Sequence, residues 1–282
     1  MISYLKLIKF SHTIFSFPFA LIGFLFALDS GYELPSWLTI TYIVLAIVFA
    51  RTAAMAFNRW ADWKIDLKNP RTKNREIPKG IIKPKQALNL TIISSVIFII
   101  LAGLINELCL WLSPLALFII LFYSYSKRFT YLTHFILGIA LGIAPAATYI
   151  AVTGSVDPQL ILLCLAVVFW VSGFDIIYSL QDQGFDNENN LFSIPAKFGT
   201  KKSLRLSAVL HIMSIIMLFL FWLFVYNSYI SLIGIILFAI MLIYQHIDIR
   251  KNGLKKINLF FGIMNGSAST ILGIFYLIDF LI

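Results

Sequence analysis

The sequence predicts an all-α integral membrane protein, folded as a single bundle of nine transmembrane helices. Hydrophobic residues make up 60% of the 282 residues and charged residues only 12%. Soluble domains are roughly 45–50% apolar and about 25% charged. The mean hydropathy of +0.89 points the same way. Nearly the whole chain is needed for spans and short connections, so we expect one domain over residues 1–282.

Nine apolar runs are candidates to cross a hydrocarbon core about 30 Å thick, which requires roughly 20 residues of helix, and their boundaries extend by several residues either way. They lie at about residues 12–28, 38–60, 88–106, 109–124, 131–152, 159–180, 204–226, 229–246 and 257–280. Glycine and proline inside the fifth run are compatible with a membrane helix, because neighbouring helices can satisfy the backbone groups. No small-residue cleavage site flanks the first run, so we expect a retained span.

The basic residues alternate between connections, as the preference of Lys and Arg for cytoplasmic loops requires. Twenty of the 22 Lys and Arg residues lie before the first run or after the second, fourth, sixth and eighth runs. The other connections contain acids but no Lys or Arg. We therefore expect a cytoplasmic N-terminus, a C-terminus outside, and capping loops on the cytoplasmic side. The net charge of +9 follows from this topology and requires no nucleic-acid partner.

Two acidic pairs lie at the cytoplasmic ends of the second and sixth runs. Asn58, Asp62 and Asp66 are four residues apart, as are Asp182 and Asp186. Residues at this spacing share one face of a helix, where like charges repel. Ionisable groups beside hydrocarbon are costly and indicate function. We expect folding to bring the two pairs together around a cation.

Aspartates without His or Cys favour a hard cation such as Mg²⁺ or Ca²⁺ over zinc. The non-functional alternative is that these acids pair with nearby Lys and Arg as solvated loop charges. Mg²⁺ commonly completes its shell with substrate phosphate. Two Mg²⁺ would balance four carboxylates, and Lys and Arg donors at the same boundary would balance a diphosphate. The sequence thus favours a lipid diphosphate substrate whose tail lies among the helices.

Three segments resemble motifs of the UbiA-type intramembrane prenyltransferases. Residues 58–75, with Asn58, Asp62, Asp66, Arg71 and Arg75, resemble the first Asp-rich motif of that family, and residues 178–186 resemble the second. The segment Tyr123-Ser-Tyr-Ser-Lys127-Arg128 resembles the tyrosine–lysine segment after the fourth helix. The nine-helix count is also that of the family, so the resemblance extends over essentially the whole chain.

The resemblance implies Mg²⁺-dependent transfer of a prenyl chain from an allylic diphosphate to an aromatic or other lipid acceptor. Carried over by position, the metal and diphosphate ligands are Asn58, Asp62, Asp66, Asp182 and Asp186. Lys127 and Arg71 are the expected phosphate contacts. Tyr123 and Tyr178 are candidates for stabilising a carbocation by the faces of their rings; the alternative is that they only pack against other side chains. Asp175 is a candidate for binding substrate or removing a proton.

Arg51 lies seven residues, about two turns, before Asn58 on the same face. A buried Arg is costly without an anion. We expect Arg51 to face the carboxylate of the acceptor, with pairing to Asp175 or another internal acid as the alternative.

Two segments depart from the family pattern: Glu76 stands where proline is common, and residues 187–190 lack a basic residue. Residues 193–199 resemble bacterial members that prenylate 4-hydroxybenzoate for ubiquinone-type quinones. A dihydroxynaphthoate acceptor for menaquinone is the alternative. A bacterial inner-membrane location is expected, without an obligate protein partner.

A cation-coupled transporter is the competing class of protein. In transporters, however, the functional carboxylates lie near the bilayer midplane, and transporter folds are built from internal repeats. The acids here cluster at one boundary, and only Asp-x-x-x-Asp recurs in the two halves.

Overall fold

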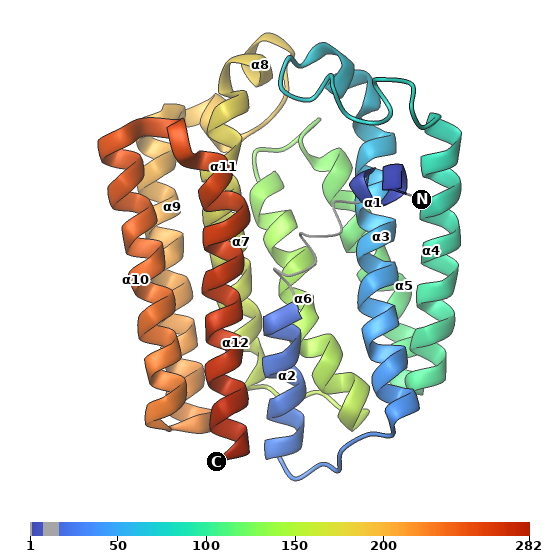
Figure 1. Ribbon diagram of the computed structural model, residues 1–282, viewed down its shortest axis with the longest axis vertical. Coiled ribbons are helices and arrows are strands. Elements are labelled where there is room, and N and C mark those ends of the chain that lie inside the picture. Colours follow the sequence, from blue (N-terminus) through green and yellow to red (C-terminus); the bar gives the residue numbers. More distant parts are fainter. Residues whose placement is uncertain (1, 8–16) are drawn as a thin grey trace. The chain divides into compact units, whose positions relative to one another are not determined.

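The computed structural model describes residues 2–7 and 17–282, which are predominantly helical (Figure 1). Neither of these two ranges contains a β-strand, which confirms the all-α prediction. By contact, the chain divides into two compact units. Unit 1 comprises Met1–Thr13 and Pro35–Tyr125, and unit 2 comprises Ile14–Leu34 and Ser126–Ile282. The single-domain prediction stays a prediction.

Unit 1 is formed around a long helix that carries the first acidic pair. Its described helices are α1 (Ile2–Leu7), α3 (Trp37–Lys68), α4 (Pro84–Ile105) and α5 (Glu107–Ser126). Ser36 caps the start of α3 by accepting a hydrogen bond from the Thr39 N–H at 3.2 Å, which satisfies one of the free amides of the first turn. Helices α3 and α4 pack along each other. The Nε of Arg59 donates to the Leu7 carbonyl at 3.4 Å and so holds α1 against α3.

Unit 2 contains the remaining helices. They are α2 (Phe17–Asp29), α6 (Thr133–Thr153), α7 (Leu160–Ser179), η2 (Leu180–Asp182), α8 (Gln183–Glu188), α9 (Ile194–Phe221), η3 (Trp222–Tyr226), α10 (Tyr229–Asn252), η4 (Gly253–Lys256), α11 (Ile257–Leu259), η5 (Phe260–Met264) and α12 (Asn265–Leu281). Helix α9 is kinked at Gly199, whose φ of 73° lies in the left-handed region. A glycine occupies that region without steric cost, so the first turn of α9 is separated from its long apolar part.

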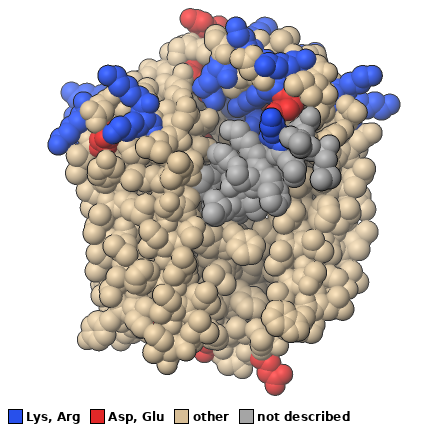
Figure 2. All heavy atoms as spheres, in the orientation of Figure 1, with Lys and Arg blue, Asp and Glu red and all other residues tan. Residues whose placement is uncertain are grey.

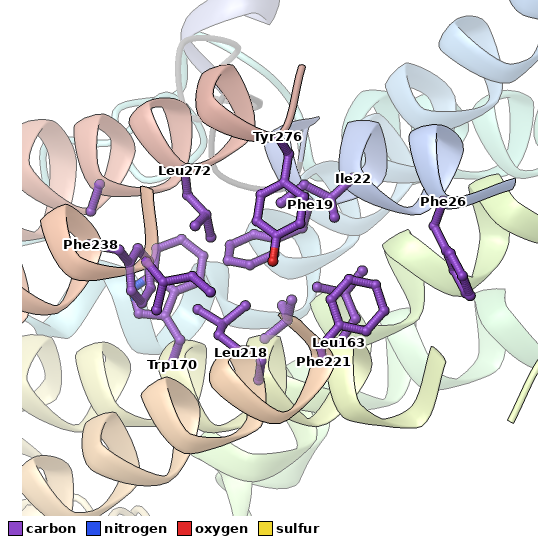
Figure 3. Close-up of a cluster of buried hydrophobic side chains, with 14 of the residues drawn as sticks. Phe19, Ile22, Phe26, Leu163, Trp170, Leu218, Phe221, Phe238, Leu272 and Tyr276 are labelled. Carbon is purple, nitrogen blue, oxygen red and sulfur yellow. The ribbon is translucent and has the colours of Figure 1, made fainter. Parts of the chain in front are cut away.

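Trp170 lies at the centre of an aromatic core in unit 2 (Figure 3). Its ring lies 5.1 Å from both Phe19 and Phe174 and 5.8 Å from Phe238. These residues come from α2, α7 and α10. Helix association in a membrane depends on close van der Waals contact rather than on the hydrophobic effect. The interlocked rings supply that contact, and they hold α7 at the centre of the unit.

Helix α6 approaches α7 closely because it lacks a side chain at Gly138. A Cβ at this position would lie 2.5 Å from Ser172 Oγ and 2.6 Å from the Val168 carbonyl. The Oγ of Ser172 lies 2.7 Å from the Val168 carbonyl of its own helix and 3.2 Å from the His134 carbonyl of α6. Small residues allow this close backbone approach in membrane helices, so the start of α6 is rigidly attached to the part of α7 that precedes the second acidic pair.

Seven helical stretches of the described chain are long and apolar enough to cross a membrane, and they identify a multi-pass integral membrane protein. Helix α2 is apolar but has 13 residues, and the stretch Tyr229–Leu281 contains two of the predicted spans, in α10 and α12. Every predicted run coincides with a helix, although residues 12–16 of the first lie outside the described part, as does Lys9. The count of nine crossings and the sides of the termini stay predictions. On the face shown in Figure 2, the Lys and Arg side chains lie at helix ends and not along the apolar lengths.

Candidate active site

The first acidic pair lies on one continuous helix. Helix α3 extends to Lys68, so Asn58, Asp62 and Asp66 share a face, as predicted. Asp62 is only 2% exposed and Asp66 only 4%. The amide nitrogen of Asn58 donates to Asp62 Oδ2 at 3.3 Å. These two acids are therefore buried in unit 1 and are not solvated charges, whereas Asp182 and Asp186 of the second pair are only half-buried.

Asp66 has a basic partner that the sequence did not identify. The Nη1 of Arg75 donates to both carboxylate oxygens of Asp66, each at 2.8 Å. The turn at Asn69 and Pro70 makes this possible, because proline cannot continue α3. The Asn69 side chain then accepts from the Arg71 N–H at 2.9 Å, and this turn brings Arg75 back over the end of the helix. Arg75 thus compensates one carboxylate charge.

Removing Arg75 is expected to destabilise the connection between α3 and α4. In Arg75→Ala the buried Asp66 loses its cation, an effect we place at about 1–3 kcal/mol because the Arg75 side chain is partly exposed. The measurement is thermal unfolding in lipid nanodiscs, with hydrogen exchange of residues 69–82. Lys256→Ala is the matched control, since Lys256 binds Asp248 at 3.1 Å but is 48% exposed. A larger effect from the control would contradict the assignment.

Arg51 is a half-buried cation in the apolar part of α3. Its Nε is buried and has no hydrogen-bond partner within the described ranges. A buried guanidinium nitrogen without a hydrogen bond is costly, which makes Arg51 a candidate contact for an anionic group of a ligand. Unit 1 contains two other residues predicted to contact the substrate. Arg71 is exposed, and Tyr123, on α5, is half-buried.

The second acidic pair does not lie on one continuous α-helix, and here the prediction was wrong. Helix α7 ends at Ser179, a 3₁₀ turn follows, and Asp186 lies in the separate short helix α8. Asp182 stands at the junction, with φ of −101° and ψ of 1°. This region of backbone space is sparsely populated and frequent at active sites. Asp182 and Asp186 therefore lie on two consecutive helical segments and not on one regular α-helix.

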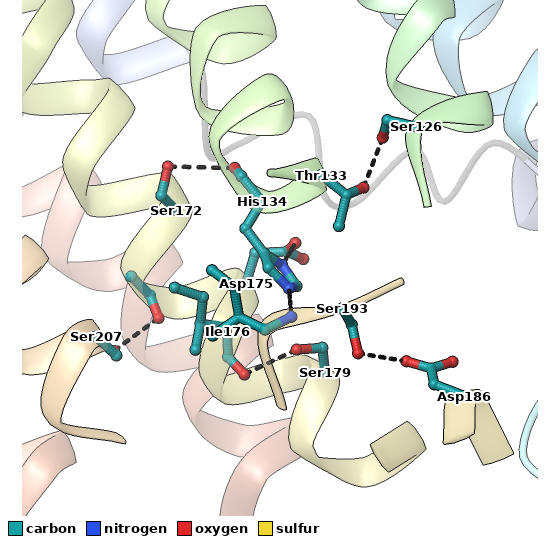
Figure 4. A network of polar contacts seen from close by, with 12 residues as sticks. Ser126, Thr133, His134, Ser172, Asp175, Ile176, Ser179, Asp186, Ser193 and Ser207 are labelled. Atoms are coloured by element: carbon teal, nitrogen blue, oxygen red, sulfur yellow. Dashed lines mark hydrogen bonds and ion pairs between the residues drawn. The ribbon is translucent and has the colours of Figure 1, made fainter. Parts of the chain in front are cut away.

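The remaining predicted residues of unit 2 have defined neighbours. Asp175 is 8% exposed, and its Oδ2 lies 2.7 Å from Nδ1 of His134, a residue that the sequence analysis did not single out. One face of Tyr178 is covered by Phe261, with the ring centroids 4.0 Å apart. The carbonyl of Lys127 accepts from the Phe192 N–H at 2.7 Å. The structure thus brings Asp175 and Asp186 into one hydrogen-bonded region together with His134 (Figure 4). The backbone of Lys127 joins this region through Phe192.

The residues of each pair fit Mg²⁺ better than a transition metal. The described chain contains no group of three or more His, Cys, Asp or Glu residues that could hold a metal by themselves. Mg²⁺ is commonly bound by one or two carboxylates, with water and substrate phosphate completing its shell. A pair of aspartates in each unit is such a partial, oxygen-only donor set. The meeting of the two pairs, which lie in different units, stays a prediction.

The profile of the UbiA prenyltransferase family matches residues 16–268. The chain belongs to this family. The resemblance stated from the motifs is thereby confirmed, and it covers nearly all of the chain.

Among curated relatives, the 4-hydroxybenzoate octaprenyltransferase of Aliivibrio fischeri is 34% identical over 166 residues, which is 59% of this chain and 58% of the relative. The enzyme of the same name from Thiobacillus denitrificans is 33% identical over 165 residues, covering 58% of this chain and 56% of the relative. The matches thus span less than two thirds of these relatives' lengths.

Solved structures extend the likeness to the whole fold. The apo structure of a UbiA homologue from Aeropyrum pernix K1 is 33% identical, with a TM-score of 0.86, over 95% of this chain and 98% of that one. A UbiA homologue from Archaeoglobus fulgidus bound to GPP and Mg²⁺ is 20% identical, with a TM-score of 0.76, over 99% of this chain and all of that one. The second likeness shows the fold alone.

Proposed function

We propose that this UbiA-family chain transfers a polyprenyl group from an allylic diphosphate to an aromatic acid of the 4-hydroxybenzoate type. The reaction depends on Mg²⁺ and belongs to respiratory quinone biosynthesis in a bacterial inner membrane. The observation that carries the proposal is the pair of buried carboxylates on α3, Asp62 and Asp66, within a chain matched by the family profile over residues 16–268. The names of the curated relatives support the acceptor, and the A. fulgidus homologue supports the metal and the allylic diphosphate.

The proposed diphosphate end comprises the two acidic pairs. Asp62 and Asp66, with Asn58, would hold Mg²⁺ in unit 1, and Asp182 and Asp186 would hold Mg²⁺ in unit 2. Bound Mg²⁺ supplies positive charge that favours departure of the diphosphate. Lys127 and Arg71 donate to phosphate oxygens and stabilise the same charge. In the arrangement described above, Asn58 donates to Asp62 and therefore also orients that carboxylate.

The proposed acceptor end lies deeper, where Arg51 binds the acceptor's carboxylate. Loss of diphosphate leaves an allylic carbocation, and the ring carbon ortho to the phenol attacks it. A ring proton then leaves and aromaticity is restored. Water must be excluded because it would capture the cation, and the apolar helices with their capping loops provide that exclusion. The rings of Tyr123 and Tyr178 are the proposed cation-stabilising groups, and Asp175 is the proposed substrate contact.

The test is transfer of a radiolabelled prenyl diphosphate by the purified full chain in nanodiscs. We expect prenylated 4-hydroxybenzoate to form with Mg²⁺, to be lost on chelation with EDTA, and to return when Mg²⁺ is restored. A dihydroxynaphthoate is offered in parallel as the alternative acceptor. If the enzyme prefers the dihydroxynaphthoate, that compound replaces 4-hydroxybenzoate as the proposed acceptor. Transfer to neither acceptor would refute the proposal.

A further inference from the structure

Residues 190–194, here called the anchor segment, connect α8 to α9 and are fixed by three contacts. The Phe192 N–H donates to the Lys127 carbonyl at 2.7 Å. The Ser193 hydroxyl donates to Asp186 Oδ2 at 2.8 Å. The Ile194 N–H donates to Nε2 of His134 at 3.3 Å. Consecutive residues of one short segment thus contact two residues of the proposed diphosphate end and one buried histidine.

The contacts of His134 determine which of its ring nitrogens carries the hydrogen. Because Nε2 accepts from the Ile194 N–H, the hydrogen lies on Nδ1, which donates to Asp175 Oδ2 at 2.7 Å. His134 is 2% exposed, so neither contact is replaced easily by water. The imidazole is therefore a fixed bridge from α7 to the first residue of α9.

Two further polar contacts lie beside this bridge. Ser172, one turn before Asp175 on α7, has its Oγ 3.2 Å from the His134 carbonyl. The Thr133 and Ser126 hydroxyls lie 2.6 Å apart, and both residues belong to unit 2 (Figure 4). Buried polar contacts of this kind favour one geometry of the residues that they join.

The other side of the anchor segment fixes the backbone of Asp186. Asn190 has a left-handed φ of 53°, and the Leu191 N–H donates to the Asp186 carbonyl at 2.9 Å. This is the Schellman ending of a helix. It gives a structural reason for the asparagine at position 190, because asparagine tolerates the left-handed region better than most residues. Asp186 is thus held through its carbonyl by Leu191 and through its side chain by Ser193.

We propose that His134 and Ser193 are positioning residues for Asp186, with His134 holding the anchor segment and Ser193 orienting the carboxylate. The inference rests on the proposed function, in which Asp186 is a metal ligand. By donating to Oδ2, the Ser193 hydroxyl orients the carboxylate and leaves Oδ1 available to a cation. Groups that orient metal-binding carboxylates in this way typically change metal affinity about 10–100-fold when they are removed.

Ser193 has two roles that variants can separate. It also caps α9, by accepting from the Ala196 N–H at 3.3 Å. Ser193→Ala removes both contacts, whereas Ser193→Thr keeps the hydroxyl. Ser228 is a matched control, because it caps α10 and also donates to a carboxylate, that of Asp279, outside the proposed site. Ser228→Ala therefore reports the cost of losing such a cap and contact elsewhere.

The binding readout is thermal stabilisation of the full chain by Mg²⁺ in the presence of an unreactive thio-analogue of geranyl diphosphate. We expect Ser193→Ala to raise the Mg²⁺ concentration for half-maximal stabilisation by about 10-fold or more, and Ser193→Thr to restore it. Ser228→Ala should lower the melting temperature without moving that concentration. An unchanged Mg²⁺ dependence in Ser193→Ala would overturn the positioning role alone. Absence of any Mg²⁺ effect on the wild type would overturn the proposed function as well.

His134 is tested by two amide replacements. The side-chain amide of His134→Gln reaches the place of Nε2 and can accept from Ile194, while that of His134→Asn reaches the place of Nδ1 and can donate to Asp175. We expect Gln to preserve slow hydrogen exchange at Ile194 and near-normal Mg²⁺ dependence. Asn should speed exchange at Ile194 and weaken the Mg²⁺ response several-fold. The reverse order would overturn the role of His134 in holding the anchor segment.

Discussion

Asp62→Ala is expected to abolish prenyl transfer while the protein still inserts and folds. Asp62 is almost fully buried on α3 and accepts from Asn58. Because Asp62 lies within a helix, no neighbouring side chain can take the place of its carboxylate unless the helix moves. Loss of a group that stabilises transition-state charge typically costs about 10²–10³-fold in rate, and we expect a loss of at least that size. Asp182→Ala should behave alike, as the corresponding acid of the second pair.

The measurement is kcat/KM for the prenyl diphosphate with purified variants in nanodiscs, alongside their melting temperatures. Asp62→Asn keeps the size of the side chain but removes its charge, so it should be nearly as inactive as Asp62→Ala. Asp248→Asn is the control, since Asp248 is a 6%-exposed carboxylate on α10 outside the proposed site. Normal turnover by a well-folded Asp62→Ala enzyme would rule out the proposed role.

The second large effect is expected at Arg51, and it should be confined to the aromatic acceptor. Arg51→Ala should lower kcat/KM for 4-hydroxybenzoate by about 10–100-fold, because a hydrogen bond to a charged group contributes about 1.5–3 kcal/mol. The KM for the prenyl diphosphate should change little. The buried Nε of Arg51, which finds no partner in the described part of the chain, is the structural reason.

An acceptor without the carboxylate separates this role from a general loss of structure. With 4-hydroxybenzyl alcohol, wild type and Arg51→Ala should differ far less than with 4-hydroxybenzoate. Such a cycle isolates the interaction between Arg51 and the carboxylate. Arg51→Lys should recover part of the activity, since lysine keeps the charge but not the planar fork. Equal losses with both acceptors would count against the assignment.

The sequence alone determined the features that follow from local periodicity. Its apolar runs predicted every long helix, because membrane spans require about 20 apolar residues in a row. The four-residue spacing of Asn58, Asp62 and Asp66 predicted their common face, and α3 continues far enough to produce it. The motifs also identified the family, since they are contiguous in the chain.

Only the tertiary structure decided how the charges near these motifs are compensated. Arg75 reaches Asp66 because a turn at Asn69 reverses the chain, and His134 meets Asp175 from another helix, 41 residues away in sequence. The 3₁₀ turn between α7 and α8 likewise places Asp182 and Asp186 on consecutive segments, whereas spacing alone had placed them on one α-helix. Helical periodicity acts within a few residues, so it specifies which side chains share a face. Their partners arrive from other segments and are fixed only when helices pack and buried polar groups must find hydrogen bonds.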